Sequence, residues 1–114
     1  MVKLARRIKY VRDDRNALFG HGLFGEQGWD MLLALYIAEG EGYRLKVGDL
    51  CNESLVPQSI AIRWIEPLVE LHMAHRRSNP LDTRSIFVEI QPATAVMMTR
   101  FLEATDAKCL RVDC

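Results

Sequence analysis

Residues 57–92 read PQSIAIRWIEPLVELHMAHRRSNPLDTRSIFVEIQP and carry the clearest structural pattern in the chain. Pro57 suits the first position of a helix, where its missing N–H has no intrahelical partner. Helical spacing over 57–71 then predicts an apolar stripe made of Ile60, Trp64, Leu68 and Leu71, with Ala61 and Ile65 beside it. The other side offers Gln58, Ser59, Ile62, Arg63 and Glu66. We expect Pro67 to kink the helix or end it near Glu66, because an interior proline costs about 3 kcal/mol.

The second half of this stretch predicts a β-hairpin. Residues 73–77 and 85–90 have the composition of strands, and the second alternates Ile86, Val88 and Ile90 against Phe87 and Glu89. Residues 78–84 between them are rich in turn formers, so we expect a projecting loop. Pro92 then opens a last helix, whose predicted stripe comprises Met98, Leu102, Cys109 and Val112.

Helical patterns also precede residue 57. Trp29, Leu32, Leu33, Tyr36 and Ile37 follow i, i+3, i+4, i+7, i+8 and predict a helix with Asp30 near its start and Gly40 past its end. An extended piece at 43–46 leads to a brief helix over 47–52, with Val47, Leu50 and Cys51 on one side. An amphipathic helix is predicted over 3–18, with the apolar residues Leu4, Ile8, Val11 and Leu18, and Gly20, His21 and Gly22 stop it.

Length and composition indicate one small globular domain. The chain has 114 residues, of which 49% are hydrophobic and 26% charged, unlike a disordered chain. We divide it into a basic N-terminal helix over 1–20, a core over 29–91 and a C-terminal helix over 92–114. Lys and Arg balance Asp and Glu at 15 each, so any site for a polyanion must be local. The basic residues of the first segment are Lys3, Arg6, Arg7, Lys9, Arg12 and Arg15.

Several functional classes are disfavoured. The longest apolar run, 31–38, is far shorter than the roughly 18 residues of a membrane span, and the N-terminus lacks a secretory pattern, so we expect a cytoplasmic protein. Cys51, Cys109 and Cys114 are odd in number and scattered, which argues against a disulfide framework, and His72 and His75 have no completing ligands at zinc spacing. No nucleophile–base pair or phosphate loop is readable. We therefore expect no enzymatic activity, metal or cofactor.

The order helix, helix, short strand, short helix, helix and hairpin is that of a winged helix-turn-helix. The predicted fold class is α+β, mostly α, with a two- to three-stranded wing sheet and flanking N- and C-terminal helices. Within it, Arg76-Arg77, Asp82-Thr83-Arg84 and Ile90-Gln91-Pro92 resemble the multiple-antibiotic-resistance regulator (MarR) family, which has an Asp-x-Arg wing signature and a Leu-Thr-Pro-like helix start. The resemblance covers roughly residues 29–100 and is most specific in the wing.

This resemblance implies a transcriptional regulator that binds palindromic duplex DNA as a homodimer. Gln58, Ser59 and Arg63 would then read the major groove, and Arg84, oriented by Asp82, would enter the minor groove. Arg76 and Arg77 are candidate phosphate anchors. The family also implies dimerisation through long terminal helices and a small phenolic or anionic effector. Here only residues 92–114 follow Gln91, so the dimerisation helices are shortened, and we assign no effector residues.

Each assignment has a purely structural alternative. Asp82 and Arg84 could form an exposed ion pair in a solvated loop. Arg76 and Arg77 could lie on the solvent face of an edge strand. The apolar stripes of the terminal helices could simply close the core of a monomer. The basic residues of the N-terminal helix suit a solvated face. A second hypothesis is a protein–protein adaptor that presents Ile62, Trp64 or the basic helix to a partner. A third is an effector sensor without DNA output.

Overall fold

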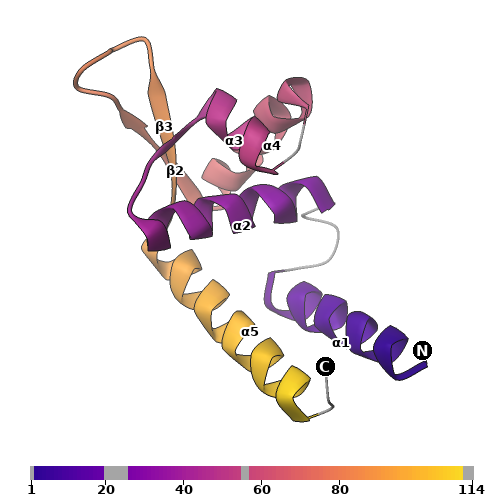
Figure 1. Cartoon of the computed structure of the whole chain (residues 1–114). Helices are drawn as coiled ribbons and strands as arrows, with labels where there is room; N and C mark the ends of the chain where they lie inside the picture. The colour runs from indigo at the N-terminus through magenta and orange to yellow at the C-terminus, as the bar shows by residue number, and fades with distance from the viewer. Residues whose placement is uncertain (1, 20–25, 55–56, 112–114) are drawn as a thin grey trace. The chain divides into compact units, whose positions relative to one another are not determined.

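The computed structural model of the chain describes residues 2–19, 26–54 and 57–111 (Figure 1). The chain divides into two compact units, residues 24–95 and residues 1–23 with 96–114. The elements of the first unit are α2 (Glu26–Glu41), β1 (Leu45–Lys46), α3 (Val47–Ser54), α4 (Gln58–Glu70), β2 (Ala74–Ser78) and β3 (Ile86–Ile90). α5 (Pro92–Arg111) begins there and continues in the second unit, which also holds α1 (Val2–Phe19).

β1, β3 and β2 form an antiparallel sheet in that order. β2 and β3 pair from Ala74 opposite Ile90 to Ser78 opposite Ile86, and Leu45 of β1 pairs with Val88. One face of the sheet contributes Leu45, Ala74, Val88 and Ile90 to the core, all of them buried. The structure confirms the predicted hairpin and the fold class: a mostly helical α+β winged helix with a three-stranded wing sheet.

α2 lies at the centre of the unit 24–95 and is covered on more than one side. Met31, Leu32 and Leu35 are fully buried, and Ala34 and Ala38 are also buried, whereas Ile37 of the predicted stripe is 47% exposed. The sequence predicted that one side of this helix is buried. The buried surface is wider than predicted, because α2 packs against α3, α4 and β3 at once. The predicted end was also wrong: α2 passes through Gly40 to Glu41, and the left-handed residue that follows is Gly42, with φ 79°.

α4 differs from its prediction in two respects. Its buried residues are Ala61, Ile65 and Leu68, while Ile60 and Trp64 are half-buried and Leu71 is exposed, so the buried stripe is rotated from the predicted one. The helix also does not end near Glu66; it continues through Pro67 to Glu70, with Pro57 as its N-cap. Burial of Leu68 next to the proline contributes roughly 1.5–3 kcal/mol, which offsets most of the proline's cost of about 3 kcal/mol.

The end of α4 has a Schellman motif with an unusual residue in its left-handed position. The N–H of Met73 donates to the carbonyl of Leu68 at 2.9 Å, and the N–H of His72 donates to the carbonyl of Val69 at 3.0 Å. His72 has φ 58°, where a Cβ is unfavourable and glycine is preferred.

We expect His72→Gly to raise the free energy of unfolding by about 1 kcal/mol, because the left-handed strain of a residue with a Cβ exceeds the entropy cost of glycine. Chemical denaturation measures this change. Gly42→Ala is the opposite control: its Cβ would meet nothing within 4 Å, so a lower stability there would report backbone strain alone. An equal or lower stability of His72→Gly would contradict the prediction.

In the second unit α1 confirms the helix predicted over 3–18. Phe19 of α1 and Phe101 of α5, both buried, meet edge to face with ring centroids 6.4 Å apart, a contact that the predicted stripes did not include. Met98 is buried and Leu102 half-buried, while Leu18 is 47% exposed. The side chains of Leu4, Ile8, Arg7, Cys109 and Val112, and the glycine turn at 20–22, lie outside the described part of the chain.

Candidate nucleic-acid interface

α4 presents a polar face on the side opposite its buried stripe. Gln58, Ser59 and Arg63 are exposed on this helix, as predicted, while Ala61, Ile65 and Leu68 are buried. Ile62 and Glu66 share the exposed side, and Ile62 is 55% exposed. The helical period therefore separates one face that packs on the core from one that is available to a ligand.

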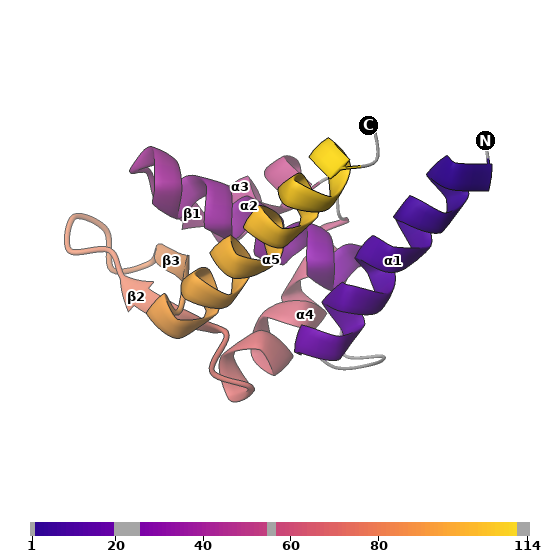
Figure 2. The same ribbon diagram turned by 90° about the horizontal axis from the view of Figure 1, so that it is seen from below.

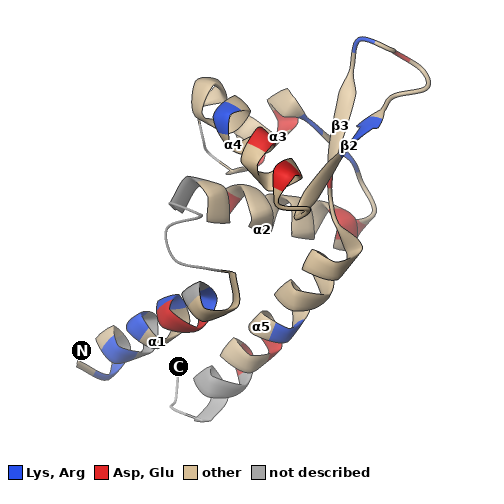
Figure 3. Cartoon of the chain, turned by 180° about the vertical axis from the view of Figure 1, so that it is seen from behind, with Lys and Arg blue, Asp and Glu red and all other residues tan. Residues whose placement is uncertain are grey.

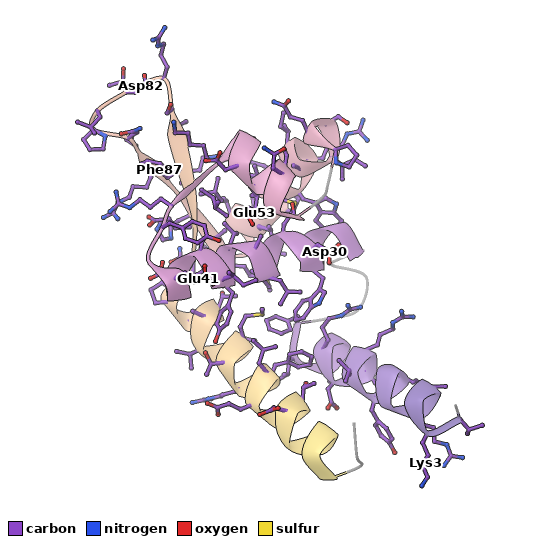
Figure 4. All side chains as sticks on the ribbon, viewed as in Figure 1. Lys3, Asp30, Glu41, Glu53, Asp82 and Phe87 are labelled. Atoms are coloured by element: carbon purple, nitrogen blue, oxygen red, sulfur yellow. The ribbon has the colours of Figure 1, made fainter. Side chains whose placement is uncertain are left out.

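Asp82 organises the loop between β2 and β3. Its Oδ1 accepts the backbone N–H of Arg84 at 3.0 Å, and its Oδ2 accepts the hydroxyl of Ser85 at 3.1 Å. Figure 4 shows Asp82 in the loop at the far end of the hairpin from the helices. The Arg84 side chain is 93% exposed, and its Nε lies 3.6 Å from Asp82 Oδ1. Asp82 thus contacts Arg84 more closely through the backbone than through the guanidinium, since charge-assisted hydrogen bonds are about 2.7–2.9 Å long.

The hydrogen bonds to Asp82 predict a pH-dependent loop. The Arg84 N–H, then the Ser85 hydroxyl, lower the pKa of Asp82 below its ordinary value. At a pH above the ordinary aspartate pKa of about 3.9, the ionised carboxylate of Asp82 contributes fully to the stability of the folded loop. This contribution is lost as the pH falls through the lowered pKa of Asp82. We expect the amide proton shift of Arg84 in an NMR titration to move in this acidic range, and Asp82→Asn to abolish the movement. A titration midpoint at or above the ordinary pKa of aspartate would contradict the lowered pKa of Asp82.

Arg76 and Arg77 are neighbours on β2 and therefore face opposite sides of the sheet. Arg76 Nη2 donates to Glu66 Oε2 of α4 at 2.6 Å, and Arg77 Nη1 lies 3.5 Å from Glu89 Oε1 of β3. The ion pair between Arg76 and Glu66 joins the hairpin to α4, and Figures 1 and 3 show both elements on the same side of α2. The structure thus brings Arg76 to the helix that carries Arg63.

Glu89 is the centre of a charged cluster on the outer face of the sheet. Its side chain is 13% exposed, with His75 Nε2 at 3.3 Å and Arg44 Nε at 3.8 Å in addition to Arg77. Arg44 also lies over the ring of Phe87, 5.6 Å from its centroid. We did not predict Glu66 or Glu89 as site residues. The alternation of the strands places His75, Arg77 and Glu89 on one face, whereas nothing local to the sequence indicates the pair between Glu66 and Arg76.

The predicted cations do not form one continuous basic stripe. Arg76 is paired with Glu66 and Arg84 lies near Asp82, while Arg77, the next residue after Arg76 on β2, faces the other side of the sheet. In Figure 3 the hairpin and α4 carry both basic and acidic positions. Figure 2 shows the loop that carries Arg84 extending beyond the strands in a second view. Leu81 in that loop is 95% exposed.

The remaining candidate groups have ordinary positions. Cys51 is buried in α3 as a free thiol, and Arg6, Lys9 and Arg12 are exposed on α1. Within residues 2–19, 26–54 and 57–111 there is no group of three or more metal-ligating side chains. None of the helices in these ranges combines the length and the apolar character that crossing a membrane requires.

α3 and α4 followed by the hairpin define a winged helix-turn-helix domain. No protein-family model and no curated protein matches the sequence, but solved structures do match the fold. A MepR–DNA complex from S. aureus aligns with a TM-score of 0.71 at 15% identity, over 97% of this chain and 89% of that chain. A MarR-family regulator from Silicibacter pomeroyi aligns with a TM-score of 0.64 at 21% identity, over 95% and 67%.

NadR in complex with 4-hydroxyphenylacetate aligns with a TM-score of 0.68 at 14% identity, over 98% of this chain and 77% of that chain. The chain therefore has the winged-helix fold of MarR-family transcriptional regulators, as the wing motif predicted.

Proposed function

We propose that the chain is a MarR-like transcriptional regulator that binds duplex DNA in a sequence-specific manner. The observation that carries this proposal is the division of α4 into a buried stripe and an exposed face with Gln58, Ser59 and Arg63. The similarity of the fold to MepR, whose structure is a complex with DNA, supports it.

In this proposal α4 enters the major groove, which is about 12 Å wide and admits a helix. Glutamine is suited to adenine and arginine to guanine, because each pairs with two atoms of the base edge. Ile62, exposed between these side chains, is suited to the methyl group of thymine. Specificity would then reside in the exposed face of α4.

The wing supplies the second contact. Arg84 is almost fully exposed in a loop that Asp82 holds through the backbone. A guanidinium in this position is suited to a narrow A·T-rich minor groove, where the negative potential is concentrated. Arg76 and Arg77 are proposed phosphate anchors, although each is paired with a carboxylate in the free protein.

We further propose a cytoplasmic homodimer that recognises an inverted repeat. The terminal helices α1 and α5 would supply the dimer interface, because MarR-family regulators dimerise through such helices. Two recognition helices in successive major grooves would be about 34–36 Å apart. A small-molecule effector is proposed by analogy with NadR, which was solved with 4-hydroxyphenylacetate; no residue is assigned to it.

Selection from random duplex DNA, followed by sequencing at two salt concentrations, tests this function without a guess at the target. We expect enrichment of an inverted repeat and a shallow dependence on salt, because the chain has no net charge. The folded state of the sample is checked by circular dichroism. Absence of enrichment from a folded sample would reject DNA recognition by the free protein, and repetition with phenolic and anionic effectors would test whether an effector is required.

A protein–protein adaptor is the second candidate. The exposure of Ile62 and Leu81, at 55% and 95%, together with the carboxylates among the cations, favours it. This function predicts that Ile62→Ser abolishes capture of a protein partner, while no duplex is enriched in the selection. An enriched repeat whose affinity depends on Arg63 and Arg84 would reject it.

A further inference from the structure

The ion pair between Glu66 and Arg76 connects two elements of the proposed DNA-binding surface. The Oε2 and Nη2 atoms are 2.6 Å apart, and the two side chains are 58% and 41% exposed. Exposed ion pairs contribute little to the stability of a fold. A DNA phosphate is therefore able to compete for Arg76 without disrupting the domain.

Glu66 also occupies the exposed side of α4, in the same row as Ser59 and Ile62. A carboxylate on this face repels phosphates and at the same time holds a cation that would otherwise bind one. Arg63 is exposed on the same face and has no ion-pair partner among the described residues. The pair thus decreases the positive charge that the wing presents to any duplex.

We propose that Glu66 is a specificity-determining residue that withholds Arg76 from the phosphates of non-cognate DNA. This inference rests on the proposed function and extends it to how non-cognate sites are rejected. Non-specific affinity derives from phosphate contacts, so a cation bound to Glu66 lowers it. On a cognate site, Arg76 exchanges its partner Glu66 for a phosphate. The contacts between α4 and the bases compensate for the free energy that this exchange costs.

Glu66→Gln tests this proposal, because it removes the charge and keeps the shape of the side chain. We expect tighter binding to a non-cognate duplex and a steeper salt dependence, by about 0.9 in the logarithmic slope for one added phosphate contact. The ratio of affinities at 50 and 200 mM salt would then increase about 3.5-fold. The preference for the selected sequence over the non-cognate duplex would decrease.

A double-mutant cycle with Arg76→Gln distinguishes release of Arg76 from the loss of a repulsive charge. We expect the steeper slope of Glu66→Gln to disappear in the Arg76→Gln background. Glu70→Gln is the matched control, since Glu70 is exposed on the same helix and has no ion pair among the described side chains. An equal gain in both backgrounds, an equal gain from Glu70→Gln, or no gain at all would overturn the proposal.

The outcome separates this inference from the proposed function. If the wild-type chain selects a repeat, but Glu66→Gln has the same affinity for non-cognate duplex and the same salt dependence as the wild type, only the inference about Glu66 fails. If no sequence is enriched but Glu66→Gln binds duplex through Arg76, sequence recognition fails, and with it the specificity role of Glu66, while the release of Arg76 to phosphates is supported. If no variant binds DNA, both fail.

Discussion

Replacing Arg84 with alanine is expected to weaken binding to the selected duplex by a factor of roughly 5 to 150, which corresponds to about 1–3 kcal/mol. The side chain is 93% exposed, so the substitution removes little packing from the free protein. In the proposed complex the same guanidinium is enclosed by the minor groove, where its loss removes a desolvated charge contact. Fluorescence anisotropy with the selected duplex measures the change.

Two further variants show what the contact requires. Arg84→Lys keeps the charge but not the planar group, and we expect an intermediate affinity, because narrow-groove recognition favours arginine. Arg100→Ala, at an exposed position of α5 outside the proposed DNA-binding surface, controls for the general loss of one cation, once analytical ultracentrifugation has shown that the variant has the same oligomeric state as the wild type. Unchanged affinity of Arg84→Ala, or an equal loss from Arg100→Ala, would exclude a minor-groove role for the loop.

Leu68→Ala is expected to have the largest effect on stability. Leu68 is 1% exposed and belongs to the same core as Met31, Leu35, Leu50 and Val88. Truncation of a buried leucine lowers the free energy of unfolding by about 2–5 kcal/mol, a large part of the roughly 5–15 kcal/mol that stabilises a typical domain. Because Leu68 follows Pro67, the loss also removes the packing that offsets the proline. Denaturant unfolding, monitored by circular dichroism, measures the change.

Leu71→Ala is the matched control, because Leu71 and Leu68 both belong to the apolar stripe that the sequence predicted over 57–71. Leu71 was predicted to belong to the buried stripe but is 43% exposed, so we expect its truncation to change stability much less than that of Leu68. Similar losses from both variants would show that the stripe runs along Ile60, Trp64 and Leu71 as the periodicity suggested. Binding of DNA by Leu68→Ala is compared only at temperatures where the variant is folded.

The features that the sequence predicted well are those that depend on neighbouring residues. The alternation of 86–90, the turn formers of 78–84 and Pro92 determine local backbone conformation, and the hairpin and the start of α5 were found where they were expected. Pro57, which was expected as the first residue of its helix, is instead the N-cap of α4. The exposed positions of Gln58, Ser59 and Arg63 also follow from helical spacing once the adjacent apolar residues are buried. The order of the predicted elements led to the correct fold, and the Asp82-Thr83-Arg84 motif led to the resemblance to the MarR family.

Contacts between segments that are distant in the sequence decided the features that were not predicted. The buried side of α4 is rotated because α2, α3 and β2 pack against it, and the helix continues past Pro67 because tertiary burial of Leu68 offsets a local cost. The partners of Arg76 and Arg77 are Glu66 and Glu89, 10 and 12 residues away. Sequence patterns determined which elements form, since propensities and periods act over a few residues. Tertiary structure decided which faces are buried and which cations are neutralised, since both depend on the elements that fold against them.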